Sequence, residues 1–186
     1  MLLLVGLGNP GSNYTNTRHN IGFKIIDAIN AHFKLSKQKP KFKGLLTTGN
    51  IDEKKIYAIK PLTFMNNSGT AIKELIDYFK IEAKDVIVFH DDMDIDFTKI
   101  KAKFGGSSAG HNGIASIDKF IGKEYSRVRI GIGKPDKTLS TSDYVLNDFN
   151  DDEKEDLKTI TDNIIKSISI LIDKKLDLFS STVNNN

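Results

Sequence analysis

Two short, unbroken apolar runs constrain the fold of this chain more than any other feature of its sequence. They lie at residues 2–7 and 85–90 and are bounded by polar or turn-forming residues. Runs of this length suit strands better than helices. A strand that is apolar on both faces must be covered on both faces, which is typical of the centre of a parallel sheet. The sequence therefore predicts an α/β fold.

The rest of the chain fits the same class. Apolar patterns predict further strands at 43–49, 55–60, 98–104 and 126–132, and helices at 20–33, 67–80, 111–121 and 151–173. We expect one α/β domain with a mixed, mostly parallel twisted sheet and helices on both faces. This domain should span residues 1–180 and carry the catalytic site. Residues 181–186 should form a frayed tail, and 134–150 a loop that can cover a site.

Composition narrows the range of functions. The chain has no run of about 18 apolar residues that could span a membrane, and its N-terminal run is too short for a secretory signal. We therefore expect a cytoplasmic protein. The absence of cysteine excludes disulfides and thiolate zinc sites. Net charge is +7 in residues 1–60 and −5 in residues 141–186, which indicates either a polyanion-binding face or ordinary solvated surface.

Residues 6–11, Gly-Leu-Gly-Asn-Pro-Gly, match the glycine fingerprint of dinucleotide-binding loops. That function requires a helix to begin at the third glycine and hold the pyrophosphate. Residues 12–17 are instead rich in turn formers, and the first predicted helix begins near Asn20. We therefore favour a strand-to-loop turn that crowds Asn9, Tyr14 and His19 into one loop.

A histidine and a group of acids are candidates for chemistry. His19, at the entry of the first helix, is either a general base or a capping or surface residue. Residues 90–96, His-Asp-Asp-Met-Asp-Ile-Asp, follow the predicted central strand, and ligand sites of open α/β sheets lie beyond such ends. Asp91 can orient a histidine. A Mg²⁺ site is the competing interpretation, whereas Phe97 and Lys103 occupy positions where a calcium loop needs Gly and Glu.

Amide side chains are candidates for substrate binding. Asn66 and Asn67 precede helix 67–80, and we expect Asn67 or Ser68 to cap that helix while a neighbouring asparagine stays free. Residues 105–113 form a glycine-rich segment that runs into helix 111–121, where backbone N–H groups suit an anion or a developing oxyanion. Asn112 is either an amide donor to a substrate or the cap of that helix.

Basic residues alternate along two predicted strands. Lys99, Lys101 and Lys103 share one strand face, as do Arg127 and Arg129. Such stripes are either solvated or used to bind phosphates.

Taken together, these segments resemble the bacterial-type peptidyl-tRNA hydrolase family. The sequences GLGNPG with TRHNIGF, KPLTFMNNSG, HDDMD, GGSSAGHNG and RVRIGIGKP occur in that family's order and spacing. The resemblance covers essentially residues 1–175. Two departures are visible: Ala109 stands where glycine is usual and Met93 where leucine is usual. Ala109 should restrict the loop, since alanine tolerates positive φ poorly.

The resemblance implies hydrolysis of the ester between a peptide and the 3′ ribose of tRNA. It makes His19 the catalytic base, Asp91 the residue that orients it, and Asn9 and Asn112 active-site asparagines. The other implied residues bind substrate or tRNA phosphates: Asn66, Asn67 and Tyr14 for the first group, and Lys101, Lys103 and Arg129 for the second. Asn9 and Asn66 would bind peptide amides through paired donor and acceptor.

A ribosyl ester is activated compared with an amide, so the reaction needs neither a metal nor a covalent intermediate. We therefore expect no cofactor, no metal, no membrane contact, and a monomer that binds the acceptor stem and 3′ CCA end of peptidyl-tRNA. Two other functions compete with this one. The first is a non-catalytic RNA-binding protein on the same scaffold. The second is a Mg²⁺-dependent phosphoesterase that uses Asp91, Asp92, Asp94 and Asp96.

Overall fold

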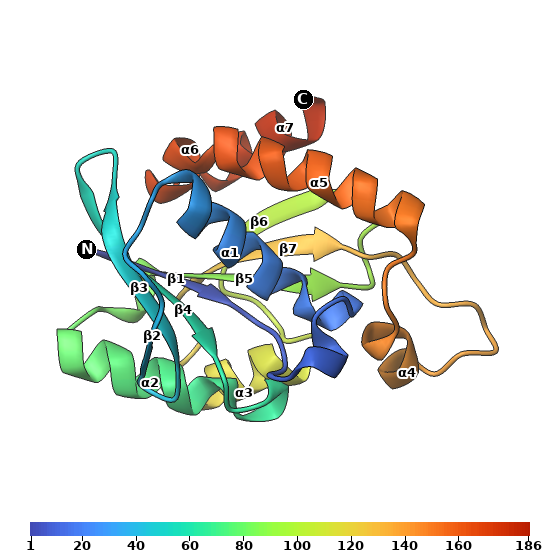
Figure 1. Cartoon of the computed structure of the whole chain (residues 1–186), viewed down its shortest axis with the longest axis horizontal. Helices are drawn as coiled ribbons and strands as arrows, with labels where there is room; N and C mark the ends of the chain where they lie inside the picture. The colour runs from blue at the N-terminus through green and yellow to red at the C-terminus, as the bar shows by residue number, and fades with distance from the viewer.

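The structure is a computed structural model that describes all residues, 1–186, and its middle layer is a seven-stranded mixed sheet (Figure 1). In sheet order the strands are β2 (Lys39–Lys41), β3 (Gly44–Ile51), β4 (Lys54–Pro61), β1 (Leu2–Gly6), β5 (Val86–Asp92), β7 (Ser126–Gly131) and β6 (Ile100–Phe104). β1 pairs in parallel with β4 and β5, and β5 pairs in parallel with β7; the outer pairs are antiparallel. The predicted fold class is therefore confirmed.

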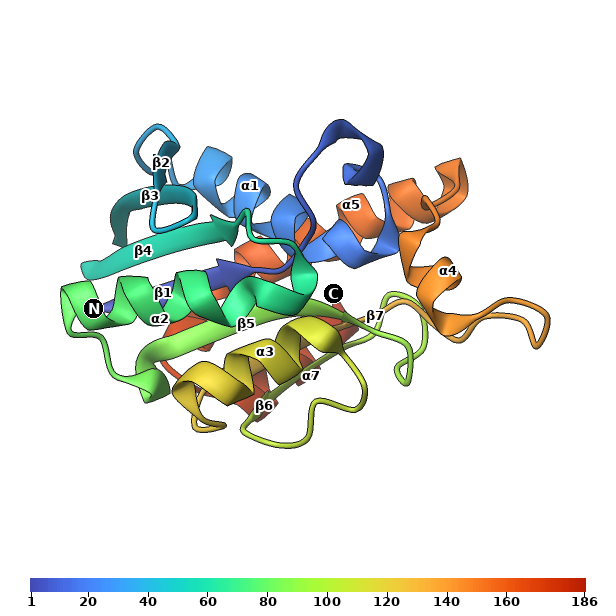
Figure 2. The ribbon, with the colours of Figure 1, turned by 90° about the horizontal axis from the view of Figure 1, so that it is seen from below.

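Helices cover both faces of this sheet. α1 (Ile21–His32), α5 (Asp151–Lys166), α6 (Ile168–Ile172) and α7 (Leu176–Asn185) lie on one face, and α2 (Ser68–Phe79) and α3 (Asn112–Ile121) on the other (Figures 1 and 2). The short helix α4 (Thr141–Leu146) stands at the end of the sheet beside the turn that leads into α1. No helix is long and apolar enough to cross a membrane.

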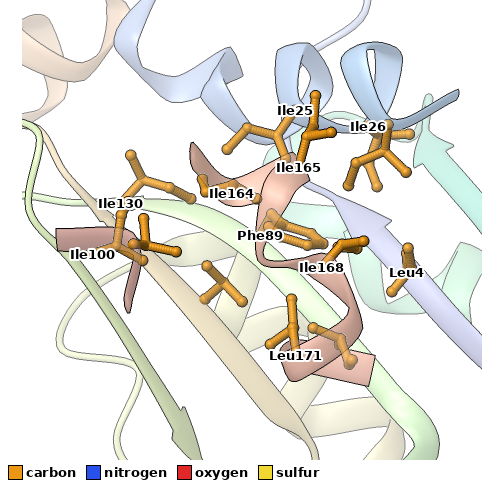
Figure 3. Packing of buried hydrophobic residues seen from close by; sticks show 14 of the residues in the cluster. Leu4, Ile25, Ile26, Phe89, Ile100, Ile130, Ile164, Ile165, Ile168 and Leu171 are labelled. Carbon is orange, nitrogen blue, oxygen red and sulfur yellow. The ribbon is translucent and has the colours of Figure 1, made fainter. Parts of the chain in front are cut away.

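The two faces of the sheet carry separate hydrophobic cores, because successive residues of a strand point to opposite faces. In β1, Leu2 and Leu4 join a cluster of 26 buried residues under α1, α5, α6 and α7, whereas Leu3 and Val5 join one of 16 residues under α2 and α3. Figure 3 shows the larger core, where Phe89 of β5 lies among Leu4, Ile25 and Ile168. This is why the runs 2–7 and 85–90 are apolar without alternation.

Glycines in the N-terminal fingerprint allow α1 to pack directly on β1. A Cβ on Gly6 would collide with the carbonyl oxygen of Gly22 in α1, and one on Gly8 would stand 2.7 Å from the ring of Phe23. The segment after the third glycine is a loop with a short 3₁₀ turn at Ser12–Tyr14 instead of a phosphate-binding helix. The prediction of a strand-to-loop turn is borne out by this geometry.

The six predicted strands and the first three predicted helices are present, with ends shifted by a few residues. Three expectations were wrong. The predicted helix 151–173 is interrupted at Ser167, the predicted loop 134–150 contains α4, and the edge strand β2 was missed.

Residues 181–185 of the expected tail form the C-terminal half of α7, and the contacts of that helix explain why it is ordered. Phe179 and Val183 are buried in the larger core. Ser180 and Asn184 bond backbone groups of β6, the edge strand: Ala102 N–H donates to Ser180 Oγ at 2.8 Å, and Ile100 N–H donates to Asn184 Oδ1 at 2.9 Å. The polar tail thus satisfies backbone groups that an open sheet edge would otherwise leave unpaired.

Candidate active site

The central feature of the site is a 3₁₀ turn, η2 (Arg18–Asn20), that directs three consecutive side chains to three different elements. With three residues per turn, successive side chains lie about 120° apart. Arg18 bonds Glu153 at the start of α5, His19 bonds Asp91 at the end of β5, and Asn20 bonds the backbone of Asn9. One short turn therefore connects the glycine loop, the central strand and the C-terminal helices.

His19 and Asp91 form a buried pair at the carboxyl end of β5. The Nδ1 atom of His19 lies 2.9 Å from each oxygen of the Asp91 carboxylate. Because an ionised carboxylate only accepts hydrogen bonds, Nδ1 must carry the proton and donate. The lone pair of the neutral ring is then on Nε2, which has no hydrogen-bond partner in the protein. His19 is held in the tautomer that a general base requires.

A second histidine, His111, also binds Asp91, and the sequence did not single it out. His111 is the N-cap of α3: its Nδ1 accepts hydrogen bonds from Gly113 N–H at 3.1 Å and Ile114 N–H at 3.3 Å. Its Nε2 must therefore be protonated, and it donates to Asp91 Oδ1 at 2.9 Å. The expected alternative of Asn112 as this cap was wrong; Asn112 is the exposed first residue of α3.

Two imidazoles hold Asp91 in its charged form. Burial alone would raise the pKa of this carboxyl, since desolvation disfavours charge. The hydrogen bonds and charges of His111 and His19 outweigh burial and hold the pKa of Asp91 well below its ordinary value. The pair therefore presents a carboxylate that stabilises positive charge on an adjacent ring.

His90 lies beneath this network and is neutral. Its Nδ1 donates to the backbone oxygen of Asp91 at 2.8 Å, and its ring meets that of His111 edge to face at 4.9 Å between centroids. Burial, and then the charge of His111, lower the pKa of His90 to about 3. A neutral ring at this position packs under His111 without competing for Asp91.

Asn9 is anchored from two sides. Asn20 clamps its backbone, accepting from Asn9 N–H and donating to Asn9 O at 2.9 Å each, and Asn9 Oδ1 accepts from Met65 N–H at 2.7 Å. Phe64, the residue before Met65, has φ 60° and ψ 158°, a region that only glycine adopts without strain. One lone pair of the Asn9 amide oxygen is thus used within the protein, and its Nδ2 group has no partner there. The expectation that Asn9 binds a peptide amide through a paired donor and acceptor stays a prediction.

The predicted site residues fall into three groups in space. One pocket is lined by His19, Asp91, His111 and Asn112 together with α4 residues Thr141, Ser142 and Val145. Asn9 lines a neighbouring pocket. Asn66 and Asn67 are exposed, and half-buried Tyr14 lies edge to face with Phe64 at 6.4 Å; none of these three lines either pocket. Asn67 is the N-cap residue of α2, as expected, but its side chain makes no capping hydrogen bond.

The four acids of residues 91–96 do not converge on one point. Asp92 accepts from Arg129 Nε at 2.8 Å, and Asp94 lies 3.6 Å from Lys134, whereas Asp91 faces the two histidines. His19, Asp91 and His111 do lie close enough to ligate one ion. Ligation through His111 Nε2 would, however, require a proton on Nδ1, which already faces two N–H donors. The cap of α3 thus disfavours a metal at this cluster.

The glycine-rich segment before α3 includes several residues with left-handed backbone. Gly106 has φ 107°, Gly110 has φ 81°, and Ala109 has φ 47°. The expectation that alanine is restrictive at this position agrees with its φ, because left-handed conformations cost an L-residue about 1–2 kcal/mol.

Basic side chains cluster where β6 pairs with β7. Lys101 is the register partner of Arg129, and Lys103 is the partner of Arg127. Burial and the adjacent guanidinium groups of Arg129 and Arg127 lower the pKa of Lys103, which shows that cations are concentrated there. Arg127 is buried and paired with Asp118 at 2.8 Å, so it is not part of a solvated stripe. Lys101, Lys103 and Arg129 remain as candidates for phosphate binding.

The open α/β sheet and the histidine–aspartate pair at its carboxyl edge are together typical of a hydrolase. Comparison with known proteins agrees: residues 3–186 match the family described as peptidyl-tRNA hydrolase. The chain is 72% identical over 185 residues to the peptidyl-tRNA hydrolase of Pelagibacter ubique (strain HTCC1062), covering 100% of both chains. It is 41% identical over 175 residues to that of Bacillus subtilis (strain 168), covering 94% of this chain and 93% of the other.

A solved structure of peptidyl-tRNA hydrolase from Acinetobacter baumannii matches with a TM-score of 0.92 at 32% identity, covering 99% of this chain and 94% of that one. The chain belongs to the peptidyl-tRNA hydrolase family, and it is a hydrolase. The resemblance noted in its sequence is thereby confirmed.

Proposed function

We propose that this protein hydrolyses the ester bond between a peptide and the 3′ ribose of tRNA, releasing the peptide and free tRNA. Family membership supports this substrate. The observation that carries the mechanism is the tautomer of His19: Nδ1 is bonded to both oxygens of Asp91 at 2.9 Å, so Nε2 is the basic nitrogen of the pocket.

In the first step, Nε2 of His19 accepts a proton from water as the water oxygen attacks the ester carbonyl carbon. The imidazolium that forms is stabilised by the carboxylate of Asp91. The tetrahedral intermediate then collapses, the bond to the ribose oxygen breaks, and the proton on Nε2 passes to that oxygen. Water is thus divided between the peptide acid and the ribose hydroxyl, with no other reactant.

The intermediate carries an oxyanion that needs hydrogen-bond donors. Asn112 lines the same pocket as His19, and its exposed amide has no partner in the protein. We assign Asn112 to water and oxyanion binding, with backbone N–H groups of residues 105–110 as the alternative donor.

Recognition of the peptide requires groups that bind backbone amides and ignore side chains. Asn9 Nδ2 is a free donor beside a fixed backbone, and the Asn66 amide offers both a donor and an acceptor. Tyr14 contacts Phe64, two residues before Asn66, and Asn67 directly follows Asn66, so we assign both to substrate binding. We therefore assign Asn9 and Asn66 to the first peptide bond, which would distinguish a blocked amine from a free ammonium.

Affinity for tRNA must come from elsewhere, because these amides are neutral. Lys101, Lys103 and Arg129 form the basic cluster at the β6–β7 pair, and phosphate contacts position a nucleic acid without reading its sequence. We assign this cluster to the tRNA phosphates, in a monomer that binds the acceptor stem and 3′ CCA end.

The experiment that tests this function measures release of free tRNA from N-acetyl-aminoacyl-tRNA. We expect hydrolysis by the wild type, loss of roughly 10²–10⁴-fold in His19→Ala, and no loss in His32→Ala, a matched exposed histidine in α1. Tight tRNA binding without hydrolysis would favour the non-catalytic RNA-binding alternative instead.

The role of Asn66 has a separate test. Asn66→Ala should narrow the rate ratio between N-acetylated and free aminoacyl-tRNA, since a site built for an amide discriminates against its absence. An equal loss on both substrates would make Asn66 a structural residue.

A further inference from the structure

Arg18 is a buried cation that the catalytic scheme above does not use. Only 10% of its side chain is exposed, although it precedes His19 directly in the sequence. Charged side chains are almost never buried unless they are paired. The partners of this guanidinium therefore indicate what Arg18 is for.

Those partners all lie between Tyr144, in α4, and Glu153, in the first turn of α5. The Nη2 atom of Arg18 donates to both oxygens of Glu153 at 3.0 and 2.9 Å. Its Nη1 atom donates to the carbonyl oxygens of Asn147 at 3.2 Å and Asp148 at 2.8 Å. The guanidinium carbon lies over the rings of Tyr144 and Phe149, 4.6 and 5.2 Å from their centroids.

The backbone reinforces these side-chain contacts. Arg18 N–H donates to Asn147 O at 3.0 Å, Phe149 N–H donates to Asn16 O at 3.1 Å, and Thr17 forms an antiparallel bridge with Asp148. We call this paired unit, residues 16–18 and 147–149, the strap. It joins the turn that carries His19 to the C-terminal end of α4.

The strap matters for the site because α4 forms one wall of the His19 pocket. Thr141, Ser142 and Val145 line that pocket, and Tyr144, on the same helix, stacks on Arg18 and donates its hydroxyl to Ile132 O at 2.6 Å. Arg18 therefore links the turn that carries His19 to the helix that forms this wall. The distance between that turn and that helix depends on where the guanidinium sits.

We propose that Arg18 is a positioning residue, which holds His19 and α4 at the spacing that hydrolysis requires while touching no substrate itself. This inference rests on the proposed function. Glu153 completes the arrangement: its carboxylate also accepts from Asn150 N–H at 2.8 Å in the capping box of α5, so the helix start fixes the anion that fixes Arg18.

Only an arginine satisfies all these partners. A lysine keeps the charge, but its one ammonium nitrogen cannot occupy the positions of both Nη1, which reaches the two carbonyls, and Nη2, which reaches the carboxylate. Arg18→Lys is therefore the conservative change that removes positioning and keeps charge.

The first test compares kcat and KM of wild type, Arg18→Lys and Glu153→Gln on N-acetyl-aminoacyl-tRNA. We expect kcat to fall by roughly 10- to 100-fold in Arg18→Lys, because misplacement of about 1 Å has effects of that size, with KM within about twofold. Glu153→Gln keeps the contacts of Arg18 with the carbonyls and the rings, so its kcat should lie between those of the wild type and Arg18→Lys.

A matched control separates positioning from loss of stability. Ile164→Val trims a fully buried side chain of α5 about three turns beyond Glu153, outside the strap and the His19 pocket. It should lower the melting temperature with kcat unchanged at temperatures where the protein is folded. If the Arg18→Lys defect disappears on cooling below the unfolding transition, as a stability defect must, the proposal is overturned.

The second test is chemical rescue. Arg18→Ala leaves a space lined by Glu153, the two carbonyls and two aromatic rings. Millimolar methylguanidine should bind in this space and raise the kcat of the variant at least tenfold. Methylammonium should not. Since guanidinium ions do not stabilise folded proteins, such recovery could not come from general stabilisation. Absence of rescue in folded Arg18→Ala, or unchanged kcat in Arg18→Lys, would refute the role. Failure of the wild type on this substrate would refute the proposed function instead.

Discussion

Replacing Asp91 with asparagine should disable the enzyme through the tautomer of His19, with little change of shape. The wild-type carboxylate accepts from two imidazole N–H groups, His19 Nδ1 and His111 Nε2. An asparagine has one accepting oxygen and one donating NH₂ group. The NH₂ group that replaces one oxygen then faces an imidazole N–H, and this contact between two donors favours the other tautomer of that ring.

The structure indicates which one yields. The tautomer of His111 is fixed by two backbone N–H groups at the start of α3, whereas Nε2 of His19 has no partner in the protein. The new asparagine should therefore turn its oxygen to His111 and its NH₂ group to His19. His19 Nδ1 then becomes the acceptor and Nε2 is protonated, which removes the general base. We expect kcat to fall by roughly 10²–10⁴-fold.

This reasoning makes an unusual prediction for a second change. His111→Ser keeps a good N-cap for α3 but removes the donor that competes for the amide oxygen in the Asp91→Asn variant. In the wild-type background it should lower activity slightly. In the Asp91→Asn background it should raise activity by about tenfold, because one hydrogen bond of roughly 1–1.5 kcal/mol no longer favours the wrong tautomer.

Two measurements check this. Steady-state hydrolysis of N-acetyl-aminoacyl-tRNA by the four proteins gives the sign of the effect of His111→Ser in each background. Nitrogen-15 spectra of the imidazole side chains give the tautomer of His19 directly. A double mutant no faster than Asp91→Asn, or a His19 that keeps its proton on Nδ1 in Asp91→Asn, would refute the argument.

Other parts of the site support three more predictions. Saturating EDTA should leave hydrolysis unchanged apart from effects on tRNA folding, because the cap of α3 disfavours metal at His111; loss restored by Mg²⁺ would contradict this. Lys103→Ala should raise KM for tRNA substrates and reduce the slope of log affinity against log salt by roughly 0.7–0.9, while a minimal nucleoside ester and the control Lys166→Ala stay unchanged. The pKa of His90 is about 3 in the folded protein and about 6.5 in the unfolded chain, so the folded state binds fewer protons and the free energy of unfolding falls as pH drops below 6.5. Between pH 7 and 5 the loss should be about 2 kcal/mol. Urea unfolding of His90→Asn should show a loss that is smaller by that amount.

Most of the fold was predictable because buried positions recur along a strand or helix with a regular spacing, and apolar residues occupy them. The runs at residues 2–7 and 85–90 had to be central strands, and both are buried on two faces. The tail was not predictable in this way. Residues 180–186, Ser-Ser-Thr-Val-Asn-Asn-Asn, look disordered by composition, yet Ser180 and Asn184 are ordered by the open edge of β6. Such polar contacts between distant segments have no local pattern.

The same distinction applies to the site. His19 and Asp91 could be expected from their segments and from the resemblance, because each segment carries an unusual group of polar residues after a strand or before a helix. His111 was overlooked because its two roles depend on the exact start of α3, which differs by one residue from the predicted start. A predicted helix that begins at residue 111 gives the His111 side chain no contact. Asn112 was therefore considered as the cap instead. A histidine directly before a helix that follows a glycine loop is the signal that could have identified it.

Arg18 shows why the remainder of a site is harder to infer. Its partners lie some 130 residues further along the chain, in segments expected to be a loop, 134–150, and the start of a helix, 151–173. Glu153 stands among acids that composition assigns to solvent, and only the capping box of α5 turns its carboxylate toward Arg18. The TRHN segment therefore holds three adjacent residues with three separate tasks. Asn20 binds the backbone of the glycine loop. In the proposed mechanism, His19 performs the chemistry and Arg18 positions α4 beside it. A change at any one of them should alter kcat for a different physical reason, and the variants described above distinguish the base from the residues that position it.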